Sequence, residues 1–325
     1  MKHFSLIWTC AVACLTISAC ATTKPTAQVQ VRPILTNSSP AEQQSFDVIT
    51  ALDAAQELRR SSDFVASYDA YSVLFEHIGS QKTTREMRAN ILLGLADSSL
   101  SLTWHGQIYE IRARELYAAI SKNIDSSENH ISRAKSGMLL LDLASLKPKE
   151  AEENLRLALE DSPNDPRLWN ALGKLHDNNA NWLDALDVYI QALTVAKQAG
   201  SSTAAVVNNM GMSLLMQGRK KEALAKFKQA NKSNPDMPVY DNNLRLAQTL
   251  SGKTKTALKG LSEIRAAQIY NDVGVIAQAQ GKPKQARYFY KKAIEQSPIY
   301  FVVAEKNLAG LLSDVVPTKT ELTPT

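Results

Sequence analysis

The chain has 325 residues, of which 44% are hydrophobic, 21% charged and 6% aromatic. Its 13 Gly and 12 Pro exclude a collagen-like or broadly low-complexity chain, and its apolar fraction is sufficient for a buried core. Three Cys exclude a disulfide-rich scaffold. The formal net charge of +5 is small for this length and does not by itself indicate nucleic-acid binding.

The N-terminus is typical of an export signal. A short basic segment is followed by residues 4–17, which are uncharged and fewer than the ~20 residues that span a membrane. The sequence Ile17-Ser18-Ala19-Cys20 resembles a bacterial lipobox, in which small residues precede an acylated Cys. We therefore expect residues 1–19 to be a lipoprotein signal peptide and Cys20 the lipid attachment site. An ordinary secretory signal cut near Ala19 is the alternative, and Cys14 is a weaker candidate for acylation.

The residue after Cys20 favours one membrane. Bacterial lipoproteins with Asp at that position tend to stay in the inner membrane, whereas this chain has Ala21. The resemblance therefore implies an outer-membrane lipoprotein that faces the periplasm. Residues 20–44, rich in Thr, Gln, Ser and Pro, predict a flexible tether with a mean span of ~25–30 Å. Residues 313–325 predict a disordered tail.

Everything between the tether and the tail predicts helix. Apolar residues recur at intervals of three and four, and no segment shows sustained strand alternation. Prolines lie between the helical segments, where the absence of a backbone N–H has little energetic cost. They are Pro163, Pro166, Pro235, Pro238 and Pro298.

An internal repeat is the main signal in the sequence. Gly173 is followed twelve residues later by Ala185, then by Tyr189 and Ala192 at steps of four and three. The same steps recur from Gly211 and Gly274, and a degenerate copy starts at Arg245 and continues through Ala257, Leu261 and Ile264. Upstream, Ala151 begins a copy of the second half of the pattern, and from it the intervals between equivalent Ala residues are 34, 38, 34 and 29.

This spacing has a physical reason. Small Gly and Ala residues let two antiparallel helices approach closely, an aromatic fills the space beside them, and the hairpin buries its apolar face by stacking on the next. The pattern resembles the tetratricopeptide repeat (TPR). It predicts an all-α, TPR-like α-solenoid of about seven antiparallel helix pairs, with degenerate repeats over 45–130 and clearer ones over 131–312. An irregular helical bundle is the alternative.

Candidate catalytic or metal-binding residues are few. The five His form no HExxH motif, and the mature chain has no Cys pair, so we expect no catalytic site, metal or cofactor. The string from Ala247 to Thr254 matches a relaxed P-loop, but it lacks a preceding strand. Gly252 aligns with Gly218 and Gly281 as an inter-helix turn, so no nucleotide is expected.

A column of Asn residues is the candidate binding surface. One Asn lies three positions before the Gly or Arg that starts each repeat pattern, and in two repeats a second Asn follows it directly. Asn amides can donate hydrogen bonds to an extended peptide backbone and accept them from it. We expect a protein-binding groove formed by Asn170, Asn208, Asn209, Asn242, Asn243 and Asn271 with Met212 and Leu246. The alternative is that these amides bond neighbouring helices or local backbone.

Charge is unevenly distributed along the chain. Residues 219–306 carry 17 Lys and Arg against 7 Asp and Glu, a net +10, whereas residues 21–218 carry 18 against 23, a net −5. The excess falls on second helices, away from the expected groove. It favours either docking to an acidic protein or anionic membrane, or simply a solubilising face. An exported chain without aromatic interleaving does not predict nucleic-acid binding.

A finer resemblance covers residues 200–310. The segments Val207-Asn208-Asn209-Met210-Gly211-Met212-Ser213-Leu214 and Asp241-Asn242-Asn243-Leu244-Arg245-Leu246-Ala247 are similar to those of TadD-type lipoproteins of tight-adherence (Flp) pilus loci. The resemblance implies a non-enzymatic adaptor that assists assembly or outer-membrane targeting of the pilus secretin. Its implied partners are the secretin or other pilus assembly components. A TPR scaffold that recruits peptidoglycan enzymes is the main alternative, and a repeat protein with an unrecognised catalytic site is another.

Overall fold

The computed structural model describes residues 47–79, 83–123 and 126–313. Within these residues every regular element is helical, which confirms the all-α prediction. The described helices form two compact units, which divide at Asp142 and Leu143. The boundary expected at residues 130 and 131 stays a prediction. The signal peptide, Cys20, the tether and residues 314–325 lie outside the described residues.

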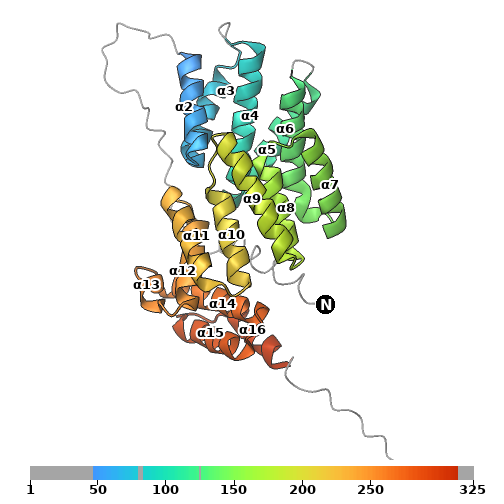
Figure 1. Cartoon of the computed structure of the whole chain (residues 1–325). Helices are drawn as coiled ribbons and strands as arrows, with labels where there is room; N and C mark the ends of the chain where they lie inside the picture. The colour runs from blue at the N-terminus through green and yellow to red at the C-terminus, as the bar shows by residue number, and fades with distance from the viewer. Residues whose placement is uncertain (1–46, 80–82, 124–125, 314–325) are drawn as a thin grey trace, which may run out of the picture. The chain divides into compact units, whose positions relative to one another are not determined.

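The described part of the first unit contains five α-helices and one 3-10 turn, coloured blue to green in Figure 1. Asp47, Asp63 and Thr84 begin the first three helices by accepting a bond from a backbone N–H in the first turn. The elements are α2 (Val48–Arg60), α3 (Phe64–Glu76), α4 (Arg85–Ser101), η2 (Thr103–His105), α5 (Gln107–Lys122) and α6 (Glu128–Asp142).

Over residues 143–313 the second unit contains ten α-helices. Four of them start with Pro in their first turn, where its missing N–H is tolerated. The elements are η3 (Leu143–Ser145), α7 (Pro148–Asp161), α8 (Pro166–Asn178), α9 (Trp182–Gln198), α10 (Ala204–Met216), α11 (Lys220–Ser233), α12 (Pro238–Leu250), α13 (Thr254–Leu258), α14 (Glu263–Ala279), α15 (Pro283–Gln296) and α16 (Val302–Ser313).

Successive helices pack as hairpins. In the second unit α8 packs on α9, α10 on α11, α12 on α13 and α14 on α15 (Figure 1). The first helices of these hairpins also contact one another in order, from α8 through α10, α12 and α14 to α16. We call this series the first-helix row. The described residues form fifteen α-helices, most of which pack on the next helix in the chain, in line with the predicted solenoid of about seven helix pairs.

Close contact between a glycine and an aromatic ring joins the two helices of a hairpin. A Cβ added to Gly173 or Gly274 would lie 2.5 Å from a ring carbon of Tyr189 or Tyr290, respectively. At Gly211 it would lie 2.8 Å from the ring of Phe227. These rings are fully buried. The predicted role of the glycine and aromatic positions is therefore confirmed for these hairpins.

The first unit uses the same contact in a different order. The ring of Tyr71 on α3 lies against Gly94 on α4, and that of Tyr117 on α5 lies against Gly137 on α6. Here the aromatic precedes its glycine in the chain, whereas in the second unit it follows. This reversal explains why the repeat pattern is harder to recognise over the first unit.

The turns inside the hairpins share one backbone conformation. Gly218, Gly252 and Gly281 have φ between +68° and +80°, and the next residue's N–H bonds back to a carbonyl five residues earlier. This is a Schellman-type helix end, which favours glycine. Ala180 occupies the same position between α8 and α9, with φ +58°, although a Cβ is unfavourable there.

The second helix of the degenerate repeat is short and has a single buried residue. α13 spans five residues, Thr254–Leu258, and buries only Ala257. Arg245 stands where the other copies have glycine, and its guanidinium donates to the carbonyl oxygens of Ala257 (2.5 Å) and Lys259 (3.3 Å). The Arg245 guanidinium therefore hydrogen-bonds the C-terminal end of α13. This hairpin has no aromatic ring packed against a glycine.

Replacing Ala180 with Gly should stabilise the protein, because the left-handed backbone at this turn no longer carries a Cβ. We expect a gain of about 1 kcal/mol in the free energy of unfolding, measured by urea denaturation. The matched variant Gly218→Ala should lose a similar amount. A loss of stability in Ala180→Gly would contradict the assignment of strain to this position.

Candidate functional site

The predicted binding residues lie on the first-helix row. Asn170 is on α8, Asn208 and Asn209 are on α10, and Asn271 is on α14. The adjacent pair Asn242 and Asn243 is on α12. The repeat spacing thus places one or two amides on each successive first helix, as the sequence predicted.

Most of these amides bond one another. Asn209 Nδ2 donates to Asn170 Oδ1 (2.9 Å), which joins α10 to α8. Asn243 Nδ2 donates to Asn208 Oδ1 (2.9 Å), which joins α12 to α10. A weaker bond of 3.4 Å between Asn208 Nδ2 and Asn209 Oδ1 completes a four-amide chain across three helices. These amides therefore act as contacts between neighbouring first helices.

Burial divides the predicted residues into two groups. Asn208, Asn243 and Asn271 are buried, as is Leu246, which belongs to a hydrophobic cluster. The partly exposed group consists of Asn170, Asn209, Asn242 and Met212. Only the second group presents polar or adaptable atoms to a partner without unfolding. Peptide binding by the whole column stays a prediction.

Asn307 extends the row beyond the predicted residues. Its Nδ2 donates to Asn271 Oδ1 (2.9 Å), which joins α16 to α14. It lies 36 residues after Asn271, close to the repeat period, and this interval could have indicated it. The final helix carries no Gly–Ala–aromatic pattern, so the repeat search did not reach it.

A buried carboxylate on α8, about two turns after Asn170, also joins helices of the first-helix row. Asp177 on α8 accepts hydrogen bonds from Tyr189 Oη on α9 (2.9 Å) and from Ser213 Oγ on α10 (2.6 Å). It is 5% exposed. Burial raises the pKa of this carboxyl from 3.8 to about 6, although the two donated bonds oppose the shift. The carboxyl group of Asp177 therefore joins two hairpins.

Asp177 should make stability depend on pH. Its folded pKa lies above its unfolded value, so its contribution to stability is complete below about pH 4 and is lost as the pH rises through about 6. The Asp177→Asn variant cannot ionise and should lose this decline, which is on the order of 2 kcal/mol. Urea denaturation of both proteins from pH 4 to pH 7 measures the difference. Parallel pH profiles for the two proteins would contradict the role of Asp177.

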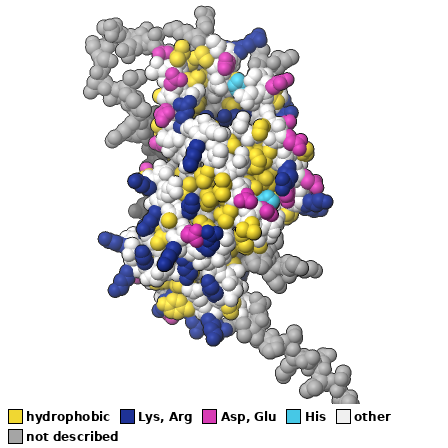
Figure 2. All heavy atoms as spheres, viewed as in Figure 1, with side chains coloured by type: hydrophobic (Ala, Val, Ile, Leu, Met, Phe, Trp, Pro, Cys, Tyr) yellow, Lys and Arg dark blue, Asp and Glu magenta, His cyan; other side chains and the backbone are white. Residues whose placement is uncertain are grey.

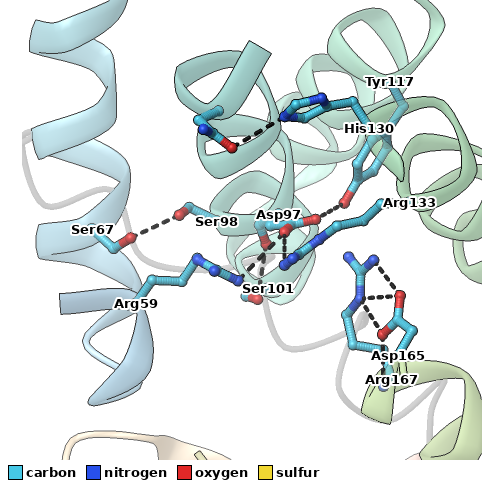
Figure 3. Close-up of polar contacts among 11 residues, drawn as sticks. Arg59, Ser67, Asp97, Ser98, Ser101, Tyr117, His130, Arg133, Asp165 and Arg167 are labelled. Atoms are coloured by element: carbon cyan, nitrogen blue, oxygen red, sulfur yellow. Dashed lines mark hydrogen bonds and ion pairs between the residues drawn. The ribbon is translucent and has the colours of Figure 1, made fainter. Parts of the chain in front are cut away.

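A second polar cluster lies inside the first unit (Figure 3). Asp97 on α4 accepts from Tyr117 Oη (2.7 Å) and pairs with Arg133 on α6 (2.6 Å) and, at 3.5 Å, with Arg59 on α2. The Asp97 side chain is 6% exposed, and the two Arg side chains are about one-third exposed. Four helices thus converge on one carboxylate. Sequence reasoning did not find this cluster, because its members lie 16 to 38 residues apart with no motif.

Removing the charge of Asp97 should destabilise the first unit. Two guanidinium groups would then lie close together without their shared anion. We expect Asp97→Asn to lower the free energy of unfolding by about 2–3 kcal/mol, less than for a fully buried pair because both Arg side chains are partly exposed. The exposed Asp53→Asn on α2 is the matched control and should change stability by less than about 0.5 kcal/mol. Equal effects of the two variants would assign no special role to the cluster.

Other candidate chemistry is limited. Among the described residues, no group of His, Cys, Asp or Glu is arranged to hold a metal ion. None of the described helices combines the length and the apolar character that crossing a membrane requires. The P-loop-like string lies across the end of α12, a turn and the start of α13, and Gly252 has the left-handed φ of +80° expected of an inter-helix turn.

A family model for the tetratricopeptide repeat matches residues 267–300, which cover most of α14 and all of α15. The α14–α15 hairpin is a tetratricopeptide repeat. The α8–α9 and α10–α11 hairpins share its Gly, Ala and aromatic positions, and stacked hairpins of this kind form a scaffold suited to protein–protein interaction. A search of curated proteins finds no match to the sequence.

Similar solved structures are distant. A tetratricopeptide repeat protein from Parabacteroides merdae is 15% identical, with a TM-score of 0.38 and coverage of 82% of this chain and 98% of that one. PilF of Pseudomonas aeruginosa is 15% identical, with a TM-score of 0.37 and coverage of 70% and 99%. PilW, described as a type IV pilus biogenesis factor, is 15% identical, with a TM-score of 0.35 and coverage of 82% and 98%. Similarity this distant identifies no partner.

Proposed function

We propose that this chain is a non-enzymatic lipoprotein adaptor of the outer membrane, attached through acylated Cys20 and facing the periplasm. Its first-helix row binds a segment of a protein partner, and the partner is the secretin of a Flp (Tad) pilus or another component of its assembly. The lipobox-like segment and the resemblance to TadD-type lipoproteins support the location and the partner.

The observation that carries the adaptor role is the continuity of the first-helix row. Amide bonds of 2.9 Å join α8 to α10 and α10 to α12, so three successive hairpins keep a fixed register. Partly exposed Asn170, Asn209, Asn242 and Met212 repeat along this row. A repeated set of donors and acceptors suits the backbone of an extended segment, while Met212 can adapt to varied side chains.

Partner capture tests the proposal. Affinity-tagged protein recovered from detergent-solubilised envelopes should retain the secretin, as detected by antibody. The double variant Asn209→Ala/Asn242→Ala removes two partly exposed amides of the row and should reduce that capture at least tenfold, because the partner's backbone loses its hydrogen-bond partners. The control Asn164→Ala/Asn181→Ala alters two exposed Asn residues of turns and should leave capture unchanged.

The outcomes separate the parts of the proposal. Equal secretin capture by both double variants would refute binding through the row. Recovery of peptidoglycan enzymes without secretin would favour the cell-wall scaffold. Attachment is decided by fractionating cells that carry Cys20→Ser, because a soluble periplasmic product is expected only if acylated Cys20 holds the protein at the membrane.

A further inference from the structure

The second helices of the last three hairpins present a basic face. Figure 2 shows Lys and Arg side chains gathered over α11–α15. The members of this basic face are exposed cations on α11, on α13 or directly after it, and on α15, namely Lys221, Lys228, Lys232, Lys255, Lys259, Lys284, Arg287 and Lys291. The first helices form their own row, so the basic face belongs to the other member of each hairpin.

On α15 the face follows the helix period. Lys284, Arg287 and Lys291 are spaced by three and four residues, which puts them on one side of the helix. Tyr288 lies among them and is 55% exposed. The opposite side is buried and includes Tyr290, whose ring lies against Gly274. The glycine contact therefore fixes which side of α15 faces outward.

The charges of this face are not neutralised within the described residues. Glu222 on α11 pairs with Arg219 (2.6 Å), and Glu295 on α15 pairs with Lys292 (2.7 Å). Neither Arg219 nor Lys292 belongs to the basic face. The eight cations of the face make no ion pair with another described residue, so their field extends into solvent.

Exposed large apolar side chains lie on α15 and in the segment that follows it. Ile299 and Tyr300, in the turn after α15, are 64% and 75% exposed, and Tyr288 stands within the charged stripe. Exposed aromatic and aliphatic side chains beside Lys and Arg are the composition of a segment that lies in a membrane interface.

We propose that the basic face binds an anionic phospholipid surface, with Tyr288, Ile299 and Tyr300 entering the headgroup region. The cations extend over three helices instead of converging on one point, which suits a surface of many mobile charges better than one acidic protein. The proposal rests on the proposed function in one respect. Acyl chains on Cys20 would hold the protein at the same leaflet, so weak binding becomes effective there.

Vesicle co-sedimentation of the full chain carrying Cys20→Ser, and therefore unacylated, tests this proposal. Binding is expected to vesicles of phosphatidylglycerol and phosphatidylethanolamine but not to phosphatidylcholine alone, and it should weaken as NaCl is raised. The triple reversal Lys284→Glu/Arg287→Glu/Lys291→Glu should weaken binding about tenfold or more, because each cation near an anionic surface contributes several-fold to affinity.

A matched triple reversal controls for net charge. Lys135, Lys149 and Lys197 are exposed cations outside the basic face, and their replacement by Glu should change vesicle binding much less. Circular dichroism confirms that each variant is folded. The milder Tyr288→Ser/Tyr300→Ser keeps every charge and should also weaken binding, because it removes the apolar contacts.

Three results would overturn the proposal: no binding of the unacylated chain to anionic vesicles, equal losses in the two triple reversals, or binding to poly-glutamate without binding to vesicles. The last would assign the face to an acidic protein. The Cys20→Ser protein carries no acyl chains and the vesicles contain no secretin. A negative result would therefore not bear on attachment through Cys20 or on secretin capture, which have their own experiments.

Discussion

Packing of an aromatic ring directly onto a glycine backbone sets the distance between the helices of a hairpin. Any Cβ at Gly173, Gly211 or Gly274 would lie within 2.8 Å of the ring, so no larger residue permits the same approach. The ring is fully buried, and its contact therefore combines apolar burial with a fixed interhelical spacing. That contact also determines which side of each second helix faces outward.

The polar contacts depend on this spacing. An Asn amide reaches the next first helix with a bond of 2.9 Å only if adjacent hairpins keep the same separation and register. Asp177 adds a carboxylate that reaches a second helix and the next first helix at once. Buried polar groups must be paired, so a hairpin displaced by one turn would leave several of them without partners. The polar pairs thus select one stacking register, while the apolar contacts supply most of the stabilisation.

The sequence predicted the helix pairs well because their signal is local. Gly274, Ala286 and Tyr290 lie within one hairpin, and their spacing follows directly from the helix period. It also located the Asn residues on the first helices. It could not predict which amides bond each other, because that depends on the rotation of one hairpin against the next. The Asp97 cluster was missed for a related reason, since its residues become neighbours only after four helices have packed.

The short hairpin has a mechanical consequence. Amide bonds join α8 to α10, α10 to α12 and α14 to α16, but the described residues show none between the Asn of α12 and that of α14. At the same place α13 offers a single buried residue, with Arg245 bonding its end. The α12–α14 joint therefore relies on apolar packing, among side chains such as Leu246, Leu250 and Val273, instead of an amide bond. Under tension, as when a bound chain is drawn away, unravelling would begin at α13, which buries one residue, while the hairpins on either side kept their form.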